Sequence, residues 1–153
     1  MNQTGSTQGP ASSSGTAAHH SKAVAGALAL FFGWAGAHRL YLGSRIWWLY
    51  PFVSMPSMGV ALAAGGDEWY RHPGFFIASV VALGAMFEAI LICLAPDARW
   101  DARRNPGSDR ASSSGWAAVL IAIAALMLGV TLMMSVLAIA LEGYFEAIRA
   151  GRM

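Results

Sequence analysis

Charged side chains are scarce in this sequence. Only 12% of the 153 residues are Asp, Glu, Lys or Arg, and 56% are hydrophobic, whereas a soluble domain carries about 25% charged residues. The apolar residues also arrive in blocks of 15 to 26, which are longer than the amphipathic patterns of a globular core. The sequence therefore predicts one integral membrane domain of the all-α class.

Cysteine and dense basic clusters are also lacking. Cys93 is the only cysteine, so the chain can form no internal disulfide and cysteine usage indicates nothing about the redox compartment. The ten basic residues give a formal net charge of +2 and are spread over several connections, without an aromatic-interleaved basic patch. This pattern argues against nucleic acid as a partner.

Recognisable catalytic motifs are absent too. The sequence contains no P-loop, no dinucleotide fingerprint and no Ser, His and Asp arrangement. The four histidines form no helical i,i+4 pair and have no cysteine partner, and the methionines of the apolar blocks are better explained as adaptable packing than as soft-metal ligands. We therefore expect no enzymatic activity, no cofactor and no bound metal.

Four apolar blocks follow a polar N-terminal tail. Residues 1–21 are rich in Ser, Thr, Gly and Gln and are predicted to be disordered. The membrane domain is expected over residues 22–105, a Ser/Gly loop over 106–115, and a further helix with a short interfacial segment over 116–153. The blocks themselves are 23–37, 46–64, 74–95 and 116–141, and together they predict a bundle of about four transmembrane helices.

The four blocks differ in how well they fit a membrane. The third and fourth reach the roughly 20 residues that cross a bilayer. The first spans about 22 Å as a helix, so it would cross only if the helix began near Ala17, with Lys22 extending to the headgroups. The second carries Pro51 and Pro56, and we predict a kinked span or a partly re-entrant segment.

Small residues recur at helical spacing in three blocks, and such stripes let membrane helices pack closely. They are Gly26, Ala29, Gly33 and Gly36 or Ala37 in the first block, Ala78, Ala82, Ala85 and Ala89 in the third, and Ala118, Ala122, Ala125 and Gly129 in the fourth. Chance would produce such stripes about as often as specific packing in alanine-rich helices.

The connections predict an orientation. With four crossings, the first and third connections share a side that carries six arginines, against four basic residues on the side of the tail, the second connection and the C-terminus. The positive-inside rule then places the first and third connections in the cytoplasm and both termini outside. In the third connection, DARWDARR is expected to form two interfacial helical turns, with Trp100 at the headgroups and Asn105, Pro106 and Gly107 ending them. The C-terminal EGYFEAIRAGRM could extend the fourth helix.

Glu88 is the one carboxylate inside an apolar block. At the centre of a bilayer a charged side chain costs roughly 2.5 to 3.5 kcal/mol on insertion scales, so Glu88 requires a partner or a proton. We expect it to pair with Arg39 or His38 and to anchor the first connection to the third helix. The alternative is a proton or ion site, because intramembrane carboxylates often mark transport paths.

The stretch KAVAGALALFFGWAGAHRLYLG resembles the signature of the TM2 (two-transmembrane) domain family. The matching residues are Lys22, Gly33, Gly36, His38, Arg39, Tyr41, Leu42 and Gly43, whereas Leu40 replaces the usual phenylalanine. The later MFEAILICLAPDARWDARRN is loosely similar to the second part of the family pattern, with Glu88 at the place of its acid. In this interpretation Gly33 and Gly36 thin the helix end, Gly43 permits the reversal and Tyr41 sits at the membrane interface.

The resemblance implies a small multi-pass membrane protein with a cytoplasmic HRLYLG elbow and no established enzymatic activity. We therefore expect a non-catalytic interaction or anchoring module in a plasma membrane or bacterial inner membrane. Its expected contacts are the lipid bilayer, anionic lipid headgroups at the arginine-rich loops, and a protein partner or a homo-oligomer. The alternative is a small transporter or channel-like subunit that uses Glu88.

Overall fold

The computed structural model describes residues 19–106, 108 and 111–151, and every regular element among them is a helix. The predicted all-α class is therefore confirmed. The disorder predicted for residues 1–21 falls mostly on residues 1–18, which lie outside the described part. The elements are α1 (Lys22–Phe32), η1 (Gly33–Ala35), α2 (Ala37–Tyr41), α3 (Leu49–Ala64), η2 (Gly66–Arg71), α4 (Pro73–Leu94), α5 (Asp97–Arg104) and α6 (Trp116–Arg149).

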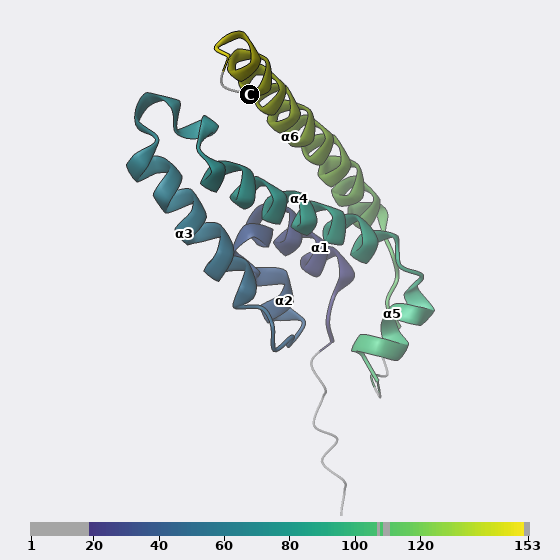
Figure 1. The fold of residues 1–153 in the computed structure, drawn as a ribbon. Coiled ribbons are helices and arrows are strands. Elements are labelled where there is room, and N and C mark those ends of the chain that lie inside the picture. Colours follow the sequence, from purple (N-terminus) through teal and green to yellow (C-terminus); the bar gives the residue numbers. More distant parts are fainter. Residues whose placement is uncertain (1–18, 107, 109–110, 152–153) are drawn as a thin grey trace, which may run out of the picture.

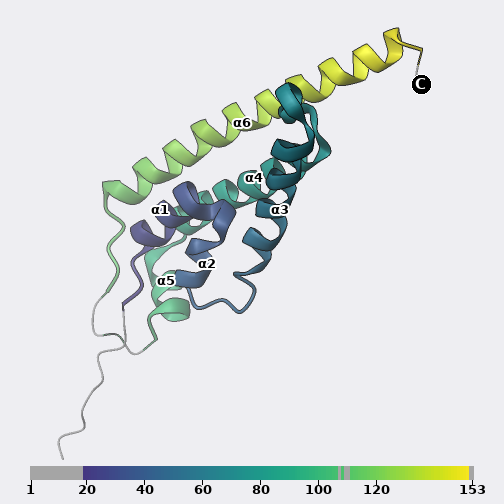
Figure 2. The ribbon, with the colours of Figure 1, turned by 90° about the vertical axis from the view of Figure 1, so that its left-hand side faces the viewer.

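Two helices are long and apolar enough to cross a membrane. They are α4, with 22 residues, and α6, with 34, which at about 1.5 Å per residue extend about 33 and 51 Å. They correspond to the third and fourth predicted blocks. The predicted extension of the last helix is also confirmed, because α6 continues to Arg149 and projects past the rest of the bundle (Figure 2).

The other two apolar segments are shorter, namely Lys22–Ala35 and Leu49–Ala64. Pro51 does not bend α3, because it lies in the first turn, where a backbone N–H would have no partner in the helix. Pro56 lies inside α3 and removes one helical hydrogen bond. The helix nevertheless continues as one element from Leu49 to Ala64, next to α4 (Figure 1).

The first apolar block is a hairpin that returns to the end where it began. Residues 19–21 are not helical, and α1 begins at Lys22 beside Ala95, at the end of α4. It runs along α4 until Gly33 lies against Ala85, after which the chain reverses at Gly36 (φ 71°). The following α2 carries the chain back until the Tyr41 hydroxyl accepts a hydrogen bond from the Ser21 amide (3.0 Å). We call residues 22–41 the hairpin.

The hairpin replaces the longer first helix that would have been needed for a full span. Among the described residues α1 begins at Lys22, after the non-helical residues 19–21, and the Lys22 side chain is only 5% exposed instead of extended to the headgroups. The physical reason is length. Eleven residues of α1 reach about 16 Å, and the left-handed backbone of Gly36 turns the chain at that depth.

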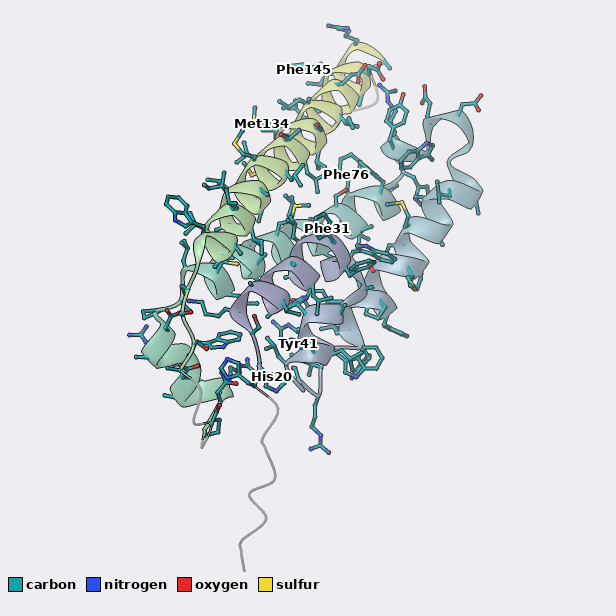
Figure 3. The ribbon with its side chains drawn as sticks, turned by 180° about the vertical axis from the view of Figure 1, so that it is seen from behind. His20, Phe31, Tyr41, Phe76, Met134 and Phe145 are labelled. Atoms are coloured by element: carbon teal, nitrogen blue, oxygen red, sulfur yellow. The ribbon has the colours of Figure 1, made fainter. Side chains whose placement is uncertain are left out.

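The elements therefore group at two opposite ends of the bundle. The hairpin end comprises His20, Tyr41, α5 and the start of α6, and the far end comprises η2 and the last turns of α6. Figure 3 shows His20 and Tyr41 together at one extreme and Phe145 at the other. The described residues 19–21 therefore lie at the end of the bundle opposite to η2 and the last turns of α6.

The centre of the bundle is built from small residues. Ala29 of α1, Ala89 of α4 and Ala125 of α6 are buried together with Leu30. A Cβ atom on Gly26 would collide with the Cys93 sulfur, so the backbone of α1 packs directly against the Cys93 side chain of α4 there. The predicted small-residue stripes thus face one another across α1, α4 and α6.

Candidate functional site

Glu88 lies six residues before the end of α4, about 9 Å along the helix. Its Oε2 atom is 2.6 Å from His38 Nε2 and accepts a hydrogen bond from Arg39 Nε (3.2 Å). Its Oε1 atom accepts from Arg39 Nη2 and from the Tyr50 hydroxyl (2.6 Å). We call these four residues the Glu88 cluster.

The Glu88 cluster joins three elements. His38 and Arg39 come from α2, Tyr50 comes from the first turn of α3, and Glu88 comes from α4. His38 and Arg39 were predicted as alternative partners of Glu88, and the structure brings both to the carboxylate. Tyr50 was not predicted, and its only signal in the sequence was a phenol placed beside an apolar block on the side of the elbow.

Charge within the Glu88 cluster is balanced at close range. The Arg39 guanidinium forms an ion pair with Glu88 and lies 5.3 Å from the centre of the Tyr50 ring. His38 is fully buried and packs edge-on against Tyr50, and its Nδ1 atom has no hydrogen-bond partner. A carboxylate with four donors retains its hydrogen bonds after leaving water, so it can be held inside an apolar bundle as an ion.

The turn of the hairpin positions this cluster. Gly33 has no room for a Cβ beside Ala85, and Gly36 combines a positive φ with a close approach to the Trp47 carbonyl. Because η1 interrupts the helix, the Trp34 carbonyl needs a new donor, and the buried Ser54 hydroxyl of α3 supplies it (2.7 Å). The turn is thus held by α3 and α4 together.

A second polar cluster surrounds Lys22 at the start of the hairpin. Its ammonium donates hydrogen bonds to the Ala95 carbonyl (2.5 Å), to Asp97 Oδ1 (2.7 Å) and to the Ser114 hydroxyl. The cation therefore caps the C-terminal end of α4, where unsatisfied carbonyls carry partial negative charge. The hydrogen bonds from Lys22 and Ser114 lower the pKa of Asp97 to about 2.

Residues 19–21 are attached to α5. The Trp100 indole donates to the His20 carbonyl (2.9 Å), and Asn105 accepts from the His20 amide (2.8 Å). The two interfacial turns predicted for DARWDARR are present as α5, and Asn105 follows its last residue. Trp100, which was predicted at the headgroup level, is only 6% exposed. It packs inward because its N–H finds a backbone acceptor there.

The remaining motif residues lie between the hairpin and α3, in residues 42–48, to which the word elbow refers from here on. The Leu42 carbonyl accepts a hydrogen bond from Arg104 of α5 (3.1 Å). Gly43, which was predicted to permit the reversal, has a left-handed backbone with a φ of 68°, although the chain first turns back at Gly36. No group of three or more metal-ligating side chains is present within the described ranges.

Comparison with known proteins identifies one part of the chain. Residues 18–64 match the family model of the TM2 domain. The match includes the hairpin, the elbow and α3 and ends before α4, so Glu88 lies outside it. No curated protein matches the chain, and no solved structure does.

Proposed function

Because the chain contains a TM2 domain and two helices able to cross a bilayer, we propose that it is a non-catalytic multi-pass membrane protein serving as an interaction or anchoring module. In this proposal the Glu88 cluster fixes the hairpin to α3 and α4. The hairpin end forms the face that contacts lipid headgroups or a protein partner. The single observation that carries the proposal is the attachment of Glu88 to donors from two other helices.

The geometry supports a structural role for Glu88 over proton or ion transport. Both carboxylate oxygens accept two hydrogen bonds each, and Arg39 balances the negative charge. A proton carrier has to exchange its proton with a path, and protonation here would remove the ion pair with Arg39. Loss of one partner from this partly buried pair would leave the other charge without its counter-ion among apolar side chains.

The proposal includes three crossings, by α3, α4 and α6, with the hairpin entering and leaving on one side. Counted by their place in the chain, seven basic residues then belong to the hairpin end and three to the far end. The seven are Lys22, Arg39, Arg45, Arg99, Arg103, Arg104 and Arg110; the three are Arg71, Arg149 and Arg152. The positive-inside rule therefore places the hairpin end in the cytoplasm.

Although α3 is short, the residues that precede it allow it to serve as one of the three crossings. Its 16 residues extend about 24 Å, less than the roughly 30 Å of hydrocarbon. Trp47 and Trp48 precede it and are 38% and 51% exposed. Tryptophan side chains at this position anchor a helix end at the headgroups, and local thinning of the bilayer accommodates the difference in length.

A double-mutant cycle tests the structural role. Glu88→Gln, Arg39→Gln and the double variant are compared with wild type by unfolding in detergent, with Glu142→Gln as the control at an exposed carboxylate. We expect Glu88→Gln to cost about 2 kcal/mol, as for hydrogen bonds to charged groups, and a coupling of about 1 to 2 kcal/mol with Arg39.

The outcomes separate the two functions. Coupling near zero would contradict the structural role. Proton or ion flux in liposomes that disappears in a stable Glu88→Gln variant would support the transporter alternative instead. Loss of stability without any wild-type flux supports the module.

A further inference from the structure

A cavity with a mixed polar and apolar lining lies beside the Glu88 cluster, between the elbow, α4 and α5. Its volume is about 320 Å³, and its lining residues include Arg39, Ser44 and Arg104. Arg39 comes from α2, Ser44 from the elbow and Arg104 from the last turn of α5. Two arginines and a serine from three separate segments therefore line the cavity. We call it the Arg39–Arg104 cavity.

The charge of this cavity is net positive. Glu88 also lines it, but its two oxygens already accept four hydrogen bonds and its charge is paired with Arg39. Arg104 is exposed and makes one hydrogen bond, to the Leu42 carbonyl. Its charge faces no carboxylate in the cavity other than Glu88. The surplus guanidinium favours an anion over a cation.

A second observation points to an unfilled polar site. His38 lines the same cavity, is fully buried, and has an Nδ1 atom without a hydrogen-bond partner. Buried polar atoms are almost always paired in folded proteins, so this nitrogen is an exception that a bound ligand would explain. A hydroxyl group of a ligand, or an ordered water molecule below the ligand's headgroup, would form a hydrogen bond with His38 Nδ1.

The remaining wall of the cavity is apolar and faces the lipid. It is formed by Leu91 and Ile92 of α4, and Leu91 is 54% exposed on the surface of a helix that can span the membrane. Free phosphate gains nothing from contact with this apolar wall, whereas the acyl chain of a phospholipid can pack against it. The cavity also lies within the last two turns of α4, at the depth where headgroup and acyl chain meet.

We propose that the Arg39–Arg104 cavity binds the phosphate group of an anionic phospholipid, with the acyl chain along Leu91 and Ile92. The inference rests on the proposed function, because it requires the hairpin end to lie at the membrane surface. It goes further by naming one binding site and one class of ligand. Arg104 contacts the phosphate, and Arg39 holds the inner wall through its bonds to Glu88.

The test uses the full chain in neutral detergent, with thermal unfolding followed as lipid is added. Phosphatidylglycerol, phosphatidylcholine with the same acyl chains, and inorganic phosphate are compared. We expect phosphatidylglycerol alone to raise Tm. Arg104→Gln should weaken its apparent affinity about fivefold, as expected for one arginine near a membrane surface. Arg103→Gln is the matched control, since Arg103 is an exposed neighbour on α5 that does not line the cavity.

Each result of this test either supports or overturns the lipid site. An equal loss in Arg103→Gln and Arg104→Gln would show only general attraction of anionic lipid and would overturn the site. Stabilisation by inorganic phosphate at similar concentrations would assign the cavity to a free anion. Arg104→Lys should keep part of the affinity, which a merely structural role would not require. Failure here leaves the Glu88 and Arg39 coupling intact, so it is distinguishable from failure of the proposed function.

Discussion

The two ends of the bundle use ion pairs in contrasting surroundings. At the hairpin end Lys22 and His38 are 5% and 0% exposed, whereas the side chains of Glu88 at this end and of Arg71 at the far end are each 25% exposed. At the far end Arg71 pairs with Glu68, Glu142 and Glu146, whose side chains are 64%, 60% and 49% exposed. Buried charges that lose a partner cannot be rehydrated, whereas exposed ones can. The hairpin end should therefore depend on its charges far more than the far end does.

Replacement of Lys22 gives the largest expected effect. Lys22→Gln removes the cation that joins the Ala95 carbonyl, Asp97 and Ser114. Breaking a buried pair costs about 3 kcal/mol or more, and we expect a loss near the lower end because Asp97 is 32% exposed. Unfolding of the variant in detergent measures this loss. A change below about 0.5 kcal/mol, typical of a surface site, would show that the cluster does not hold the hairpin.

Low pH disrupts the same Lys22–Asp97 ion pair without a mutation, and it therefore provides an independent check of this prediction. The pKa of Asp97 is lowered to about 2 in the folded chain, from an ordinary value of 3.8. A carboxyl with a lowered pKa stabilises the fold above its unfolded value, and this contribution is lost as pH falls toward the folded value. Wild type should therefore lose stability between about pH 4 and pH 2, and Asp97→Asn should lose less over that interval.

Replacement of Arg71 gives the smallest expected effect. Its hydrogen bond to Glu146, with help from Glu68 and Glu142, raises the pKa of Arg71, but these groups remain accessible to water and salt. We expect Arg71→Gln to lower Tm slightly at low salt and not measurably at about 0.5 M NaCl, where such pairs are screened. An Arg71→Gln variant as unstable as Lys22→Gln would remove the contrast between the two ends.

The sequence was sufficient for the elements whose signal is local. The lengths of the third and fourth apolar blocks predicted α4 and α6, and the run DARWDARR predicted α5. A single carboxylate in an apolar block also required a partner, and His38 and Arg39 were the nearest candidates. These inferences succeeded because run length and the cost of an unpaired charge depend little on tertiary context.

The path of the hairpin could not be predicted in this way. A run of apolar residues indicates burial in lipid or protein, but it does not show whether the chain crosses or turns back. The deciding contacts join residues that are 73 and 75 positions apart, from Lys22 to Ala95 and Asp97. A signal was present, since the first block had only 15 residues and Lys22 and Asp97 each lay beside an apolar block.

The location of the two ends of the chain tests the hairpin most directly. Single cysteines replace His19, Ser44 or Ala150 in a Cys93→Ala background, and each is treated with a membrane-impermeant maleimide in sealed vesicles of known orientation. The hairpin predicts that His19→Cys and Ser44→Cys react from one side of the membrane and Ala150→Cys from the other. Reaction of His19→Cys and Ala150→Cys from the same side, with Ser44→Cys on the opposite one, would contradict it and restore a fourth crossing.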